Sequence, residues 1–296
     1  MTTRTTRPLA GFRWLVEGFQ LLERNPGTLF GALGFFLLLS LLPSAVTLPL
    51  QMKMPGSLTV VIGVMVFSVL AGLALAPLQG GMFQVVDAIA NDRPVRARDV
   101  FAPYRRADQF WPLVGFAFAI MLVVVALLAV VVLVIGAGSW TGVLQSMAAQ
   151  QARAGEHAAL PPHLGALIAL FLLFIPIFMA LFAIGYCQVA LAGRSVTGAV
   201  ADGVIGGLKN LHVLWILMLG GLVIALVLLL IMGVLIGLLS LLTQALGPVG
   251  VVVVAGLVYI AVLLPMYAAG FGFSYFLWRD VCAVDDADAA PQPLAA

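Results

Sequence analysis

The chain has 296 residues, of which 63% are hydrophobic and only 9% are charged, and its formal net charge is +2. A soluble domain has about 45–50% apolar and about 25% charged residues, so this composition excludes an ordinary soluble protein. One of the two cysteines, Cys187, lies in an apolar segment and the other, Cys282, in a polar tail. Two thiols in these positions predict neither a disulfide framework nor a metal site.

Six apolar runs are long enough to cross a bilayer as helices, which takes about 20 residues each. Each run is apolar on all sides, as a helix in lipid is, and none shows the short alternation of a barrel strand. We therefore predict an all-α polytopic membrane protein with one integral membrane domain over residues 1–280 and a disordered cytoplasmic tail over 281–296. The runs are 28–50, 57–86, 112–136, 164–192, 211–239 and 249–277.

Lys and Arg are distributed unequally between the two sides of the predicted membrane domain. If the N-terminus is inside, only Lys53 and Arg153 of the 14 basic residues fall in outer segments. Basic residues accumulate in the cytoplasmic loops of membrane proteins. We therefore predict a bacterial inner-membrane protein with both termini in the cytoplasm. Five arginines share one cytoplasmic loop: Arg93, Arg96, Arg98, Arg105 and Arg106.

Amphipathic segments precede the first, third and fifth apolar runs. Apolar residues at spacings of three and four predict a helix on the inner membrane surface in each case. With the matching corners at Asn25 and Asn210, this order predicts three pseudo-repeats, 8–98, 99–194 and 195–280, each a surface helix followed by a transmembrane hairpin. The stripes are Phe12, Leu15, Val16, Phe19 and Leu22; Ala97, Val100, Phe101, Tyr104, Ala107 and Trp111, with Pro103 as a candidate break; and Val196, Val200, Val204, Leu208 and Leu211.

The order of amphipathic helix, Asn/Gly/Pro corner and hairpin is carried by "GFQLLERNPGTLFG", "DRPVRARDVFAPYRR" and "VADGVIGGLKNLHVLW". It resembles a group of uncharacterised bacterial polytopic inner-membrane proteins. It is also similar to the membrane domain attached to some glycerophosphodiester phosphodiesterases. The catalytic domain of those enzymes has no counterpart in this chain, so the resemblance implies the membrane fold and not the activity.

Polar side chains within the runs are few. The middle of every run lacks Asp, Glu, Lys, Arg and His, which counts against a proton relay or a charged ion pathway. Gln79, Gln84 and Asp87 lie toward the inner end of the second run, and Gln188 and Tyr275 lie at similar depth in later runs. We single out an inner polar cluster of Gln84, Asp87, Gln188 and Tyr275. Helix packing, capping and interfacial anchoring account for the same residues without a substrate.

Motifs for catalysis are missing from the sequence, which has no phosphate-binding glycine loop, no Ser nucleophile elbow and no carboxylate pair at a membrane face. Glu156, His157 and His163 share the longest outer loop, but prolines lie where a zinc-binding helix would run. We therefore expect a protein that is not an enzyme and has no cofactor, no metal site and no nucleic-acid partner.

The leading functional interpretation is envelope organisation, or the handling of a lipid or another apolar molecule. In this interpretation the five arginines bind anionic lipid headgroups, the expected partners. One alternative is a transporter or channel for a small uncharged solute that uses the inner polar cluster. Another is a subunit that stabilises a membrane complex, with a protein partner or a second copy of the chain that the sequence does not specify.

Overall fold

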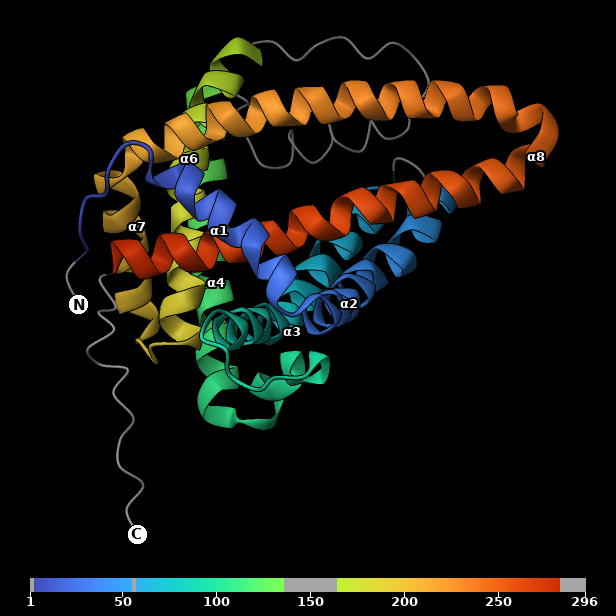
Figure 1. Cartoon of the computed structure of the whole chain (residues 1–296). Helices are drawn as coiled ribbons and strands as arrows, with labels where there is room; N and C mark the ends of the chain where they lie inside the picture. The colour runs from blue at the N-terminus through green and yellow to red at the C-terminus, as the bar shows by residue number, and fades with distance from the viewer. Residues whose placement is uncertain (1–2, 55–56, 136–163, 283–296) are drawn as a thin grey trace.

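The computed structural model describes residues 3–54, 57–135 and 164–282, and every element within these ranges is helical (Figure 1). The last helix doubles back at Gly247, where a φ of 66° breaks the helical geometry. Glycine adopts this left-handed conformation without steric cost. In chain order the elements are α1 (Ala10–Arg24), α2 (Pro26–Lys53), α3 (Leu58–Ala90), the 3₁₀ helix η1 (Ala97–Arg105), α4 (Ala107–Ile135), α6 (Leu164–Ala190), α7 (Val196–Lys209) and α8 (Leu211–Val281).

Six of the described helical segments are long and apolar enough to span a membrane. This confirms the prediction of an all-helical chain with six candidate spans. The helices extend a few residues past several of the apolar runs because polar residues at a membrane surface continue the same helix. The outer-loop residues Glu156, His157 and His163 and the predicted tail beyond 282 lie outside the described residues. The segments are Pro26–Lys53, Leu58–Ala90, Ala107–Val130, Leu172–Ala190, Leu211–Leu235 and Ile260–Val281.

The core lies where the ends of several spans meet. Of the most apolar 18-residue window in Leu172–Ala190 and in Ile260–Val281, 56% and 44% is buried, against 11–17% in the other four segments. In Figure 1 the limbs of α8 run across the view whereas α4 and α6 run up it, so these helices diverge away from the shared core. The remaining surface of the spans carries exposed Leu, Val and Ile side chains, an apolar surface that suits lipid better than water.

Helix α1 packs on α8 through a face that differs from the predicted stripe. Trp14, Gly18 and Leu21 are buried, whereas the stripe residues Phe12 and Phe19 are exposed. Gly18 allows this contact, because a Cβ there would lie 2.8 Å from the backbone oxygen of Ala269 in α8. The helix therefore has two apolar faces. One packs on α8, and the other, with Phe12 and Phe19, is exposed.

The other two surface segments also differ in detail from the prediction. Residues 97–111 do not form one amphipathic helix: η1 ends at Arg105, Arg106 is extended, and α4 begins at Ala107. In α7 the buried residues are small, including Gly203 and Gly207, and Asp202 is buried with them. A periodic apolar pattern cannot reveal a contact face built from glycines, because such a face has no side chains to form the pattern.

Candidate functional site

Three carboxylates with largely buried side chains are each paired with an arginine. Charges that are partly removed from water are stabilised by close partners of opposite sign. The pair of Asp280 and Arg13 joins α8 to α1, whereas the other two pairs join a helix to the loop next to it. The pairs are Asp87 with Arg93, Asp202 with Arg194, and Asp280 with Arg13.

Asp87, near the end of α3, is linked to α8 by a hydrogen bond from Tyr275. Its Oδ1 accepts hydrogen bonds from the Tyr275 hydroxyl and from Asn91 Nδ2, both at 2.9 Å. Arg93 pairs with the other carboxylate oxygen of Asp87. The structure therefore brings together two members of the predicted inner polar cluster, Asp87 and Tyr275. It also pairs one of the five loop arginines, Arg93, with a carboxylate of the chain.

Gln84 belongs to a separate hydrogen-bonded group. Its Nε2 donates to Gln109 Oε1 at 3.1 Å and to the Ala190 carbonyl at 3.2 Å, which joins α3 to α4 and α6. One helical turn separates Gln84 from Asp87, but their side chains bond to different neighbouring helices. The four residues singled out from the sequence therefore do not form one cluster.

Gln188, the fourth of these residues, is fully buried in α6. Its Nε2 lies 3.2 Å from Asp202 Oδ2 in α7 and 3.2 Å from the Cys282 sulfur, and Arg194 Nε contacts the same Asp202 oxygen at 3.2 Å. Burial raises the pKa of the Cys282 thiol to about 11; the charge of Asp202 also raises it, and the hydrogen bond from Gln188 lowers it. The thiol is therefore neutral and unreactive at physiological pH.

The third carboxylate, Asp280, was not found from the sequence. Its Oδ2 accepts a hydrogen bond from Trp14 Nε1 at 2.7 Å and pairs with Arg13, and its carbonyl oxygen accepts from Arg4 Nε at 2.6 Å. The sequence places Trp14 directly after Arg13 in α1, but only the crossing of α1 over α8 brings Asp280 to them.

Asn210 holds the N-terminal segment against the corner between α7 and α8. Its Oδ1 accepts from the Thr6 backbone nitrogen at 2.7 Å and from the Thr6 hydroxyl at 2.8 Å. Its Nδ2 donates to the carbonyls of Arg4 and Gly206 at 3.0 and 2.9 Å. The matching corner residue Asn25 instead caps α2 by accepting from Thr28 N at 3.3 Å. The two asparagines at these similar corners therefore make different contacts.

We expect Asp87→Asn to lower the free energy of unfolding by about 1–2 kcal/mol, because it removes the ion pair with Arg93 and places an amide donor among donors. The Asp87 side chain is only 20% exposed. Asp92→Asn is the matched control, because the Asp92 side chain is 84% exposed and its contact with Arg24 is 3.8 Å long. Chemical unfolding in detergent measures both variants, and equal losses would contradict the role given to Asp87.

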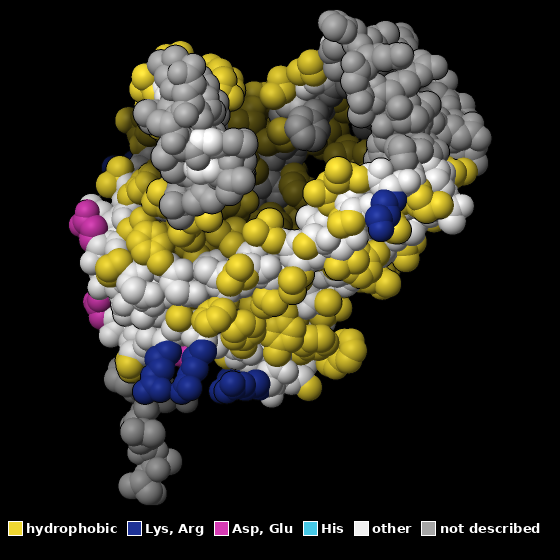
Figure 2. All heavy atoms as spheres, turned by 90° about the vertical axis from the view of Figure 1, so that its right-hand side faces the viewer, with side chains coloured by type: hydrophobic (Ala, Val, Ile, Leu, Met, Phe, Trp, Pro, Cys, Tyr) yellow, Lys and Arg dark blue, Asp and Glu magenta, His cyan; other side chains and the backbone are white. Residues whose placement is uncertain are grey.

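The basic loop, residues 93–106, presents its other four arginines to solvent. Arg96, Arg98, Arg105 and Arg106 are exposed, and none of them forms an ion pair within the described residues. Figure 2 shows Lys and Arg side chains gathered along the lower edge of a face that is otherwise largely hydrophobic. The loop therefore forms a positively charged border next to apolar surface.

The basic loop is held firmly against α2 and α3. The Phe101 ring contacts Phe35 with ring centroids 5.5 Å apart, and Val100 is fully buried. The Tyr104 hydroxyl donates to the Ala74 carbonyl at 2.8 Å. Next to the loop, Trp111 is 67% exposed. Tryptophan and tyrosine concentrate at membrane–water interfaces, so the arginines and these rings together suit a headgroup layer.

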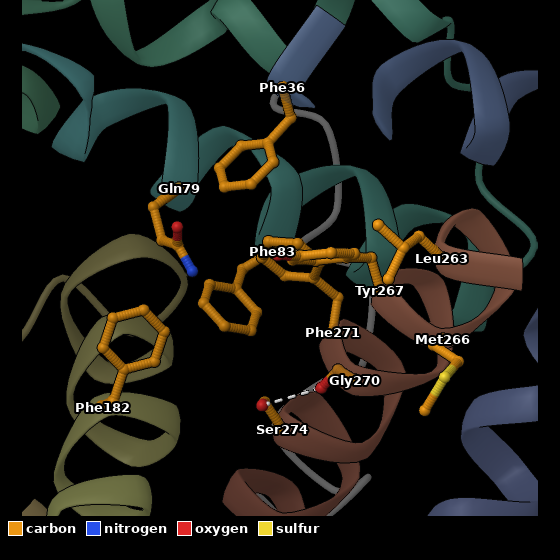
Figure 3. Close-up of a pocket in the computed structure, with 10 residues that line it drawn as sticks. All are labelled: Phe36, Gln79, Phe83, Phe182, Leu263, Met266, Tyr267, Gly270, Phe271 and Ser274. Atoms are coloured by element: carbon orange, nitrogen blue, oxygen red, sulfur yellow. Dashed lines mark hydrogen bonds between the residues drawn. The ribbon is translucent and has the colours of Figure 1, made fainter. Parts of the chain in front are cut away.

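A cavity of about 500 Å³ lies between α2, α3, α6 and α8 (Figure 3). Aromatic rings make up much of its wall, and its polar side chains are Gln79, Tyr267 and Ser274. None of the four residues of the predicted inner polar cluster lines it. From the sequence, Gln79 was placed with Gln84 and Asp87 toward the inner end of its span; the structure separates it from both.

The described part of the chain has two candidate binding features, the positively charged basic loop and the apolar cavity. Within it, no group of three or more His, Cys, Asp or Glu side chains is placed to hold a metal ion. No protein-family model, curated protein or solved structure matches the chain.

Proposed function

We propose that the chain is a non-enzymatic protein of a bacterial inner membrane that binds anionic lipid headgroups at its cytoplasmic face. It would act in envelope organisation, or in the handling of a lipid or another apolar molecule. In this proposal the spans form three hairpins, each preceded by a cytoplasmic-face element, α1, η1 or α7. The packing of α2 on α3 and of α4 on α6, and the turn of α8 at Gly247, support that arrangement.

The proposal rests on a difference between arginines that form ion pairs and arginines that do not. Those at the inner ends of the helices, such as Arg93 and Arg194, pair with carboxylates. The other four arginines of the basic loop are exposed and form no ion pair within the described ranges. Each basic residue near an anionic membrane surface contributes about 1 kcal/mol of attraction. An anionic headgroup would therefore give these four arginines the kind of partner that the paired arginines already have within the chain.

We expect Arg105→Gln/Arg106→Gln to weaken the retention of phosphatidylglycerol roughly 30-fold, which corresponds to the loss of about 2 kcal/mol. Native mass spectrometry of protein released from nanodiscs with equal phosphatidylglycerol and phosphatidylcholine measures the lipid that stays bound. The difference between wild type and variant should shrink as ionic strength rises, because salt screens exposed charges.

The control variant Arg7→Gln/Lys53→Gln removes two exposed charges of the same sign outside the basic loop, and neither residue forms an ion pair within the described residues. It should keep most of the wild-type preference for phosphatidylglycerol. Arg105→Lys/Arg106→Lys should restore most of the preference lost in the glutamine variant. Equal retention in the two glutamine variants would show that the basic loop is not the headgroup site, and its arginines would then only set the topology.

A transporter or channel for a small uncharged solute is the second candidate, and the cavity is the observation that favours it. A solute pathway would use Gln79, Tyr267 and Ser274, because these are the polar side chains that line the cavity. Solute uptake into proteoliposomes that is lost in a cavity-filling variant would support this candidate. A polypeptide retained in the mass spectra, in place of lipid, would instead support a stabilising subunit of a membrane complex.

A further inference from the structure

The cavity between α2, α3, α6 and α8 has the size and lining of a ligand site. Its volume of about 500 Å³ falls within the range of about 300–1,000 Å³ that is usual for small-molecule pockets. Such pockets combine mostly apolar walls with a few polar groups, and this cavity does the same. Elements far apart in the sequence build it, so it exists only in the folded protein.

Aromatic packing holds the wall of the cavity in place. The Phe271 ring contacts Phe83 and Phe36 edge to face, with ring centroids 5.3 Å apart in each case. Phe83 also lies 6.4 Å from Tyr186, which is buried behind the wall. Rings locked by such contacts lose little freedom when a ligand binds, so the site is preorganised for an apolar chain.

Gln79 provides the polar group of the site. Figure 3 shows its amide directed into the cavity, and this side chain makes no hydrogen bond within the described residues. An amide that faces an apolar cavity without a partner is costly, so a ligand oxygen or hydroxyl that bonds to it gains free energy.

The charge and the opening of the cavity narrow the class of ligand. The described residues that line the cavity include no Asp, Glu, Lys or Arg, so none of them would compensate a charged head. Met266 and Tyr267, on the α8 side, are 42% and 43% exposed, which leaves this side open to the surrounding lipid. The Ser274 hydroxyl donates to the Gly270 carbonyl at 2.8 Å, which leaves its oxygen free to accept.

We propose that this cavity binds one neutral single-chain lipid, with its acyl chain among the rings and a hydroxyl or ester group hydrogen-bonded to Gln79. A monoacylglycerol has this chemistry, whereas a fatty acid carries a charge and an alkane has no polar group. This site deepens the proposed function, because it names the apolar molecule that the protein would hold. It shares no residue with the basic loop.

Binding of 1-oleoylglycerol to the detergent-purified full chain tests the proposal, measured by native mass spectrometry and by the ligand-induced rise in melting temperature. Gln79→Leu keeps the size of the side chain and removes the amide, so we expect affinity to fall about five- to tenfold, as for the loss of one hydrogen bond. Gly270→Leu fills the cavity and should abolish binding; a Cβ at Gly270 meets no atom within 4 Å.

Gly63→Leu is the matched control, because Gly63 is an exposed membrane-helix glycine with no atom within 4 Å of an added Cβ, and it does not line the cavity. It should bind like wild type. Binding that survives Gly270→Leu, or oleate binding as tight as that of 1-oleoylglycerol, would overturn the proposal. Arg105→Gln/Arg106→Gln should keep 1-oleoylglycerol while losing phosphatidylglycerol, so failure of one site is distinguishable from failure of the other.

Discussion

Gly81→Ala is expected to detach the basic loop from α3. A Cβ at position 81 would overlap the Val100 carbonyl oxygen and lie 2.7 Å from the Val100 carbonyl carbon. Both atoms belong to the backbone of η1, and Val100 is fully buried, so no change of side-chain rotamer relieves the clash. Overpacking of this kind costs about 1–3 kcal/mol and occasionally more. We expect a loss at the upper end, because the whole of η1 must move.

Two measurements check this result. The thermal midpoint of the detergent-purified variant should fall by several degrees, and trypsin should cleave faster after Arg96 and Arg98 in the loosened loop. Gly72→Ala, in the same helix, is the control: an added Cβ there meets no atom within 4 Å. A Gly81→Ala protein with the wild-type midpoint and cleavage pattern would mean that η1 does not rest on α3 as described.

Gly18→Ala should separate α1 from α8. A Cβ at Gly18 would lie 2.8 Å from the Ala269 carbonyl oxygen and 2.9 Å from the Phe273 backbone nitrogen. The opposing Gly272 is equally close, because a Cβ there would lie 2.7 Å from the Gly18 Cα. Small residues allow helices to approach to this distance, and any side chain forces them apart. We expect a loss of about 2–3 kcal/mol, which includes contacts of Trp14 with the α8 end.

Hydrogen exchange provides the local readout for this variant, since the amides of α1 should exchange faster while those of α3 keep their protection. Gly11→Ala is the control on the same helix. Its Cβ would contact Leu217 and Val213 at ordinary distances of 3.4–3.5 Å. If both alanine variants behaved alike, the close crossing of α1 and α8 would not be a source of stability.

The close contact at Gly81 also bears on the proposed function. Arginines on a freely moving loop would lose conformational freedom on binding a headgroup, whereas arginines on a supported loop lose less. Val100 against Gly81 and Phe101 against Phe35 provide that support. The Gly81→Ala variant should therefore retain less phosphatidylglycerol than wild type, although all five arginines are still present.

The six candidate spans could be predicted from the sequence because length and apolar composition are local properties. A run such as 112–136 needs no partner to be recognised, and the structure has a helix there, Ala107–Ile135. The break within residues 97–111 was anticipated at Pro103 but falls at Arg106, because Pro103 is accommodated inside a 3₁₀ helix. The candidate site was predicted only as residue types. Asp87 and Tyr275 meet, but Gln84 and Gln188 bond elsewhere.

The sequence by itself determined that this chain is helical, apolar enough for a membrane and basic in one loop, because each of these properties adds up along the chain. Only the tertiary structure decided which faces of the helices meet. That choice depends on the rotation of each helix and on close approaches at Gly18 and Gly81, which leave no periodic side-chain pattern. The same packing gave Asp280 its partners and directed Gln79 into a cavity lined from four separate helices.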